Sequence, residues 1–379
     1  MIVPSATWGM PFRPFFLAAA LLAVLAIPLW LLQFLHGLSV GNVGLSWHIH
    51  EMLSGFAATV VLGFVLTAIQ TWTGQPTITG PALAGLFATW CLARLGWMLP
   101  APWTWLGAGA DFILFATAGL IVARLVYRSA NWRNAFFAPV FLVFALFSPV
   151  YLWSLTSNNY ALAHTLHQVT FYLIIHLILV VGGRVIPFFS DRRLARAPTP
   201  RFSWLEAGAL GASLGFIVAL VSGAEDNLMR GAAAAVATLN LLRWLSWRPW
   251  QALALPLLWS LYLAYFLLVT GFALMAFNGV GSGPIHLLAI GGMGLMILAM
   301  ISRVSLGHTG RELELPGGFA IAFLALVAAA LLRVGANYAI EQYALLMWSA
   351  AVGWMLGFGL FLGCFVHPLL SPRPDGKPG

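Results

Sequence analysis

Residues 44–53, GLSWHIHEML, place two histidines and a glutamate at the start of a long apolar stretch. His48 and His50 are two residues apart, and Glu51 follows directly. Neutral imidazole is a ligand for haem iron, copper and zinc. A neighbouring carboxylate can bind a metal, orient an imidazole or carry a proton. The segment therefore predicts a metal, haem or proton-handling site at the beginning of a membrane helix.

The composition places the chain in the class of membrane proteins. Of its 379 residues, 61% are hydrophobic and 7% are charged, whereas soluble domains carry about 25% charged residues. The net charge of +8 then reports orientation in a lipid bilayer and does not indicate a nucleic-acid partner. We expect one integral membrane domain over residues 1–379, all-α and polytopic.

Apolar runs of about 20 residues predict the membrane spans. Twelve such runs are present, with ends that can shift by several residues. They cover residues 14–36, 46–72, 80–99, 105–127, 134–154, 160–183, 203–222, 228–246, 252–276, 283–304, 317–336 and 341–367.

The basic residues predict the orientation of these spans. With both termini in the cytoplasm, fifteen of the eighteen Lys and Arg residues lie on the cytoplasmic side. Only Arg94, Arg230 and Arg333 lie at the outer ends. Cytoplasmic loops are enriched in basic residues, so the charge distribution favours an even number of spans close to twelve.

In this orientation six of the nine histidines fall in one layer near the outer face. These are His36, His48, His50, His164, His167 and His286. His176 lies deeper, while His308 and His367 lie at the cytoplasmic surface. Polar groups in membranes are costly and usually face the bundle interior, although a single histidine at a helix end is often an ordinary interfacial residue.

The spacing of the histidines suggests how they divide among sites. His164 and His167 are three residues apart and share a helix face, whereas His176 points to a different side. His48 and His50 diverge if they are helical, so one of them can serve another centre. We predict metal ligands among His48, His50, His164, His167 and His286, cofactor contacts from the same residues and His176, and an acid role for Glu51.

Other polar and small residues have two interpretations each. Asp111 either relays protons to the histidine layer or caps its helix. Arg184 and Arg303 either pair with haem propionates or acidic lipid, or anchor the inner face. The glycines of 287–294, LLAIGGMG, allow close approach of a neighbouring helix or of a flat cofactor.

Three stretches resemble the NnrS family of bacterial membrane proteins, and the resemblance covers nearly the whole chain. They are WHIHEMLSGFAATVVLGFVLTAIQTWTG, GGRVIPFF and HLLAIGGMGLMILAMISRVSLGHTGR. The resemblance implies a multi-pass protein of the bacterial inner membrane that contains haem and copper. It also implies a part in the response to nitric oxide and nitrosative stress, often beside denitrification genes. No CxxCH motif is present, so the haem is expected to be a non-covalent haem b.

Three functions follow as hypotheses. The first is an oxidoreductase that reduces nitric oxide to nitrous oxide at an outer, periplasmic-side centre of haem and a second metal, with membrane quinol as a possible electron donor. Histidines on the second, sixth and tenth spans resemble the haem–copper oxidase arrangement, but the adjacent histidine pair of that arrangement's seventh helix and the paired histidines of its tenth are absent. The second is a nitric oxide or haem binding or signalling protein without turnover. The third is a metal transporter.

Overall fold

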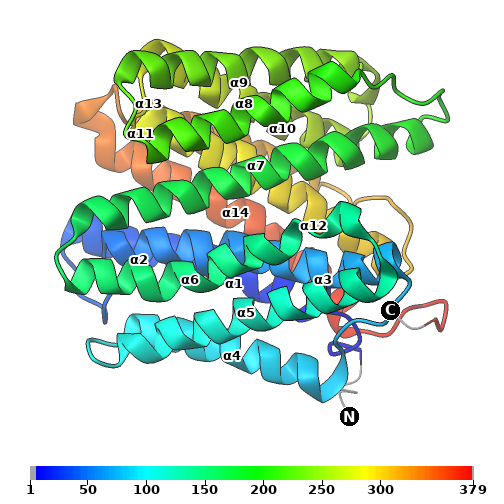
Figure 1. Cartoon of the computed structure of the whole chain (residues 1–379), viewed down its shortest axis with the longest axis horizontal. Helices are drawn as coiled ribbons and strands as arrows, with labels where there is room; N and C mark the ends of the chain where they lie inside the picture. Colours follow the sequence, from blue (N-terminus) through cyan, green and yellow to red (C-terminus); the bar gives the residue numbers. More distant parts are fainter. Residues whose placement is uncertain (1–5, 378–379) are drawn as a thin grey trace. The chain divides into compact units, whose positions relative to one another are not determined.

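The chain folds into helices. The computed structural model describes residues 6–377, and no β-strand occurs in that range. Helices are the expected solution for apolar segments in a bilayer, because each helix satisfies its own backbone hydrogen bonds. Figure 1 shows the long helices with their labels.

The helices follow the predicted ranges closely. Their bounds are α1 Phe12–His36, α2 Leu45–His50, α3 Thr59–Thr73, α4 Gly80–Met98, α5 Thr104–Ser129, α6 Phe137–Thr156, α7 Tyr160–Arg193, α8 Ser203–Val221, α9 Asp226–Ser246, α10 Pro256–Asn278, α11 Ser282–His286, α12 Leu295–His308, α13 Ala320–Gly335 and α14 Tyr343–Leu370. Two π-helical segments, η1 Glu51–Ala58 and η4 Leu287–Gly294, join α2 to α3 and α11 to α12. Short 3₁₀ turns are η2 Trp132–Asn134, η3 Pro249–Ala252 and η5 Ile340–Gln342.

Nine helical segments within residues 6–377 are long and apolar enough to cross a membrane. The chain is therefore a multi-pass membrane protein. Each of the twelve predicted ranges coincides with a helix or with one helix–π–helix segment. The helices outside the nine are α4, α9 and the 16-residue α13. The count of twelve crossings and the cytoplasmic location of both termini stay predictions.

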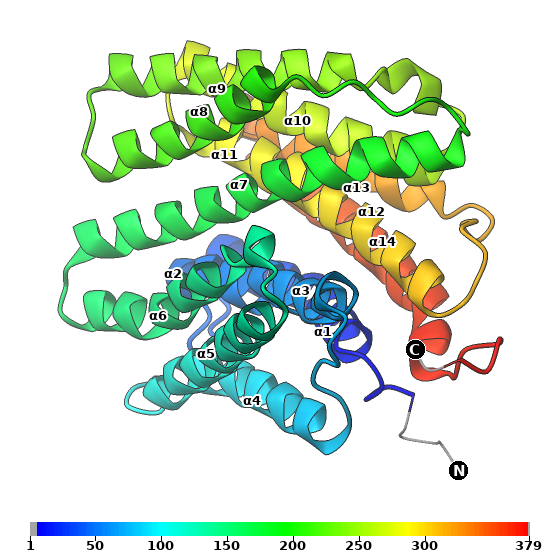
Figure 2. The same ribbon diagram turned by 45° about the vertical axis from the view of Figure 1, so that its right-hand side comes forward.

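Contacts divide the chain into two compact units. The first unit contains residues 6–170, 304–313 and 361–377 of the described chain. In it, α1 packs against η1 and α3, and α4, α5 and α6 lie side by side, as Figures 1 and 2 show. The buried Arg13 donates to the carbonyl oxygens of Leu369 and Ser371, at 2.8 Å each. These bonds tie the start of α1 to the end of α14.

The second unit contains residues 171–303 and 314–360. Here α9 packs against both α8 and α10, and η4 packs against α10 and α13. A Cβ on Gly291 would lie 3.0 Å from Leu267 of α10 and 3.2 Å from Ala330 of α13. These glycines therefore serve close helix packing, which is the first of the two interpretations of the LLAIGGMG stretch.

A buried arginine on α9 joins this helix to three others of the second unit. The Arg243 Nη1 atom of α9 donates to the Leu179 carbonyl of α7 (2.8 Å) and to the Tyr265 hydroxyl of α10 (3.1 Å). Its Nε and Nη2 atoms bind the two carboxylate oxygens of Glu206 on α8. The guanidinium lies against Gly183, where any side chain would overlap it.

Candidate functional site: a buried ion cluster around His50

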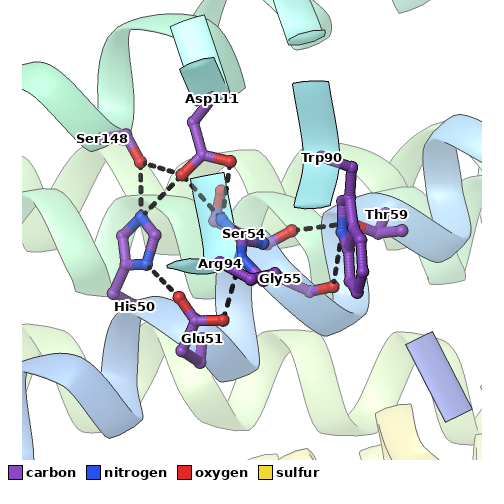
Figure 3. Close-up of polar contacts among 9 residues, drawn as sticks. All are labelled: His50, Glu51, Ser54, Gly55, Thr59, Trp90, Arg94, Asp111 and Ser148. Atoms are coloured by element: carbon purple, nitrogen blue, oxygen red, sulfur yellow. Dashed lines mark hydrogen bonds and ion pairs between the residues drawn. The ribbon is translucent and has the colours of Figure 1, made fainter. Parts of the chain in front are cut away.

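The first unit contains a π-helical segment that begins directly after His50. A π-turn leaves backbone carbonyls without their usual partners, and such segments are frequent at functional sites. Here side chains fill the gap: the Thr59 hydroxyl donates to the Ser54 carbonyl at 3.0 Å, and the Trp90 indole N–H points at the Gly55 carbonyl at 3.3 Å. Trp90 also donates to the Thr59 hydroxyl at 2.9 Å. The segment is thus fixed by Trp90 of α4 and by Thr59, the first residue of α3 (Figure 3).

Both ring nitrogens of His50 contact protein groups. Nδ1 lies 3.0 Å from Oε1 of Glu51, and Nε2 lies 3.2 Å from Oδ2 of Asp111 and contacts the Ser148 hydroxyl. The ring is fully buried and stacks on Trp97, with 3.6 Å between the ring centroids. Figure 3 shows Glu51 and Asp111 on opposite sides of the imidazole. His50 in this arrangement presents no free nitrogen to a metal.

Arg94 joins the two carboxylates. Its Nη2 atom donates to both oxygens of Asp111, at 2.7 and 2.8 Å, and its Nε atom lies 3.0 Å from Oε2 of Glu51. The helices that carry Arg94 and Asp111, α4 and α5, cross where Gly96 meets Gly107. A Cβ on Gly107 would lie 2.8 Å from the Trp97 amide nitrogen. The absence of side chains at this crossing brings the two ionic side chains within reach.

The cluster consists of two carboxylates, one guanidinium and one imidazole, all nine-tenths buried or more. Buried charges are stable only when they are paired and hydrogen-bonded. The charges of Glu51 and Asp111 exceed that of Arg94 by one, so the cluster is neutral when the His50 imidazole carries a second proton. Ser148 adds a hydrogen bond from its hydroxyl to Oδ2 of Asp111, at 2.7 Å. The His50 imidazole can therefore hold a proton between the carboxylates of Glu51 and Asp111.

The other predicted ligands of the first unit lie outside this cluster. His48 is half-buried and stacks on Trp30 of α1, with 4.1 Å between ring centroids. His48 and His50 thus face different helices, as their spacing predicts. The rings of His164 and His167 lie 4.9 Å apart, and the His167 Nδ1 atom donates to the Ala163 carbonyl at 3.1 Å.

The second unit contains the two remaining candidates. His286 is half-buried, and its Nδ1 atom donates to the Ser282 carbonyl at 2.7 Å. His176 on α7 contacts the Ser213 hydroxyl of α8 through Nδ1 at 2.7 Å. That hydroxyl donates to the Leu210 carbonyl, so it accepts the proton of the His176 Nδ1–H.

The predicted second-metal ligands do not meet in one place within the described chain. No group of three or more His, Cys, Asp or Glu side chains in residues 6–377 has the arrangement of a metal site. The predicted residues that do meet are His50 with Glu51, and His164 with His167.

Sequence reasoning missed part of the ion cluster. The sequence identifies Arg94 only as an outer basic residue and gives no signal for Ser148. Asp111 was given two interpretations, and the helix cap is wrong because Asp111 lies in the interior of α5, which begins at Thr104. A carboxylate inside an apolar span is the signal that favours a partner in the bundle, and Arg94 on the preceding helix is that partner.

The family of the chain follows from a comparison with known protein families. The sequence model of the NnrS protein family matches residues 6–373. The chain belongs to the NnrS family. A search of curated proteins found no match. As an NnrS protein, the chain is a multi-pass membrane protein of the nitric oxide response, in a family linked to haem and metal binding.

Proposed function

We propose that this NnrS protein binds haem b in the bacterial inner membrane and reduces nitric oxide to nitrous oxide near the outer, periplasmic side. The reaction joins two nitric oxide molecules with two electrons and two protons to give one nitrous oxide and one water. Membrane quinol is the proposed source of electrons. The family match supports the nitric oxide response, and the ion cluster of the first unit supports the proton chemistry.

One observation carries this proposal: Glu51 is a fully buried carboxylate held between His50 and Arg94. A reaction that consumes protons inside a membrane needs an acid next to the reacting atoms. Because solvent is excluded there, other protein groups must return a proton to that acid after each transfer. Glu51 can give up a proton and regain one from the adjacent Nδ1 of His50, whose other nitrogen, Nε2, faces Asp111. Ser148 keeps Asp111 oriented toward the imidazole, and Arg94 holds both carboxylates in place.

The ring nitrogens of the predicted histidines determine which of them can bind haem iron. A ligating histidine usually donates one ring N–H to a carbonyl or another oxygen, which leaves the other nitrogen for the metal. His167, His286 and His176 have this pattern, with Nδ1 bound to a backbone carbonyl or a serine hydroxyl. These residues fit an axial ligand role, and His50 does not. Haem iron would supply the site at which nitric oxide binds and receives electrons.

The described residues offer no group of three ligands for a second metal such as copper. The chain itself supplies an axial imidazole for the haem and the acid group that provides protons.

The proposal is tested by the reduced-minus-oxidised optical spectrum of protein produced with ample haem, recorded before and after anaerobic addition of nitric oxide. We expect a b-type spectrum that nitric oxide changes, and nitrous oxide in excess over protein when a quinol is added. A changed spectrum without sustained nitrous oxide would favour nitric oxide binding or signalling without turnover. A spectrum without haem bands would overturn the proposal and leave the histidines to a metal or transport path.

A further inference from the structure

The two units contain the same helix–π–helix arrangement. In each, a glycine with extended backbone precedes a short helix that ends in histidine: Gly44 precedes α2, which ends at His50, and Gly281 precedes α11, which ends at His286. An eight-residue π-segment follows in both, η1 and η4. The fifth residue of each π-segment is glycine, Gly55 in η1 and Gly291 in η4.

The neighbours of the π-segments correspond as well. The long helix before each segment packs against it, α1 on η1 and α10 on η4. The π-segments continue into α3 and α12, and the next helix of the chain packs against each π-segment, α4 on η1 and α13 on η4. Near the end of that following helix lies an arginine with a glycine two residues later, as Arg94-Leu-Gly in α4 and Arg333-Val-Gly in α13. Both arginines are more than nine-tenths buried.

The two copies differ in the acids that neutralise the arginine. Arg94 pairs with Glu51, the first residue of its π-segment, and with Asp111. The first residue of the second π-segment is Leu287, a buried apolar side chain. No carboxylate in residues 6–377 lies within ion-pair distance of Arg333. Its Nη2 atom donates to the Ser282 hydroxyl at 2.9 Å, and its Nη1 atom is buried without any hydrogen-bond partner.

A buried guanidinium without a counter-charge is strongly unfavourable. In the first copy, the carboxylates of Glu51 and Asp111 neutralise the guanidinium of Arg94. In the second copy, the guanidinium of Arg333 keeps an unpartnered Nη1 atom that a bound anion can neutralise. Ser282 and Asn337 are exposed at the edge of this site, and a Cβ on Gly283 would lie 3.4 Å from the Asn337 amide nitrogen. The site is thus a buried cation under an exposed polar rim.

We propose that Arg333 and Ser282 form a binding site for a small planar oxyanion with two oxygens, of the carboxylate or nitrite type. A guanidinium offers parallel N–H groups that match two oxygens of such an anion. The free Nη1 protons and the remaining Nη2 proton donate to the ligand. The evidence for this site is the repeated arrangement and the unpaired guanidinium of Arg333. The proposal does not depend on the proposed reduction of nitric oxide.

The test uses the purified full chain and sodium formate as the probe. Thermal unfolding is followed by tryptophan fluorescence while formate replaces chloride at constant ionic strength. Binding to the folded state raises the unfolding temperature in proportion to the logarithm of the formate concentration above the Kd, by about 2 °C at ten times the Kd. Arg333→Gln should abolish this rise. Arg230→Gln, which removes a half-buried arginine of the same unit that is paired with Asp226, should keep it.

A second variant gives the arginine of the second copy the carboxylate partner that Arg94 has in the first copy. Leu287→Glu places a carboxylate at the position equivalent to Glu51, where it should pair with Arg333. We expect this variant to unfold at a temperature at least as high as wild type and to lose the formate response. In the Arg333→Gln background, the same substitution should be destabilising. A formate response that survives in Arg333→Gln, a flat response in wild type, or a Leu287→Glu variant that is destabilised equally in both backgrounds would overturn the site.

Discussion

The Nη2 atom of Arg94 binds both carboxylate oxygens of Asp111, at 2.7 and 2.8 Å, in the interior of the first unit. These two residues lie on consecutive helices, and both are at least nine-tenths buried. Their contact converts two side chains that are individually unfavourable in a membrane into a paired unit. The same guanidinium also reaches Glu51, which makes Arg94 the residue on which the charge balance of the cluster depends.

Removal of the arginine should therefore be severe. Arg94→Gln leaves two carboxylates buried without their counter-charge, and we expect the free energy of unfolding to fall by about 3–5 kcal/mol. Unfolding in mixed micelles with increasing SDS measures this change. The double variant Arg94→Gln/Asp111→Asn should recover part of the loss, because residues in one network are not additive. Losses that simply add in the double variant would show that the two side chains do not interact.

The glycine of the first π-segment should tolerate no side chain. A Cβ on Gly55 would lie 2.6 Å from Oε2 of Glu51 and 2.7 Å from Nη1 of Arg94. We expect Gly55→Ala to destabilise the protein by about 1–3 kcal/mol, since overpacking displaces neighbouring groups. Gly85→Ala on α4 is the matched control, because nothing lies within 4 Å of its added Cβ. Equal stability of the two variants, measured by the same SDS unfolding, would refute the close approach.

Two adjacent glycines of α7 should behave differently. At Gly183 an added methyl group overlaps the Arg243 guanidinium, whereas at Gly182 the nearest atom is 3.5 Å away. Gly183→Ala should break the bonds from Arg243 to Leu179 and Tyr265, at a cost of about 1–3 kcal/mol. Gly182→Ala should be close to neutral. Thermal unfolding of both variants tests this prediction. A lower unfolding temperature for Gly182→Ala than for Gly183→Ala would show that Arg243 occupies another position.

Haem content should separate the histidines into two groups. Both nitrogens of His50 are engaged by protein groups, so His50→Gln should retain haem. His167→Gln or His286→Gln should reduce the haem content of the purified protein at least twofold if that residue is an axial ligand. The pyridine haemochrome assay measures this content per protein. Loss of haem in a folded His50→Gln variant, with full retention in both others, would reverse the assignment.

The sequence predicts the helices well because apolar run length is a direct requirement of the bilayer. The run 46–72 coincides with one continuous segment, α2–η1–α3. The π-segments themselves are not predictable from periodicity, because these spans are apolar on all sides and a rotation of the helix face leaves the hydrophobic pattern unchanged. The repeated arrangement is also hidden, because the matched positions share only a histidine, an arginine and three glycines among unrelated apolar residues.

The candidate site was predictable only in part. The spacing of His48 and His50 correctly implied different neighbours, but only the structure shows that His50 is the residue held between acids. Arg94 and Asp111 are 17 residues apart across a helical hairpin, and their meeting depends on the Gly96–Gly107 crossing. Single-sequence reasoning gives no register for such a crossing. The roles of His48, His164, His167, His176 and His286 stay predictions.

The central claim is that the chain reduces nitric oxide with protons supplied through Glu51. The most direct measurement is the rate of nitrous oxide formation by haem-loaded wild type and Glu51→Gln, under anaerobic conditions with nitric oxide and a quinol. Wild type should form many nitrous oxide molecules per protein, and Glu51→Gln should be at least 10-fold slower with an unchanged haem spectrum. Glu206→Gln, in the other unit, should retain activity if it still folds. Absence of turnover in wild type, or an undiminished rate in Glu51→Gln, would contradict the account.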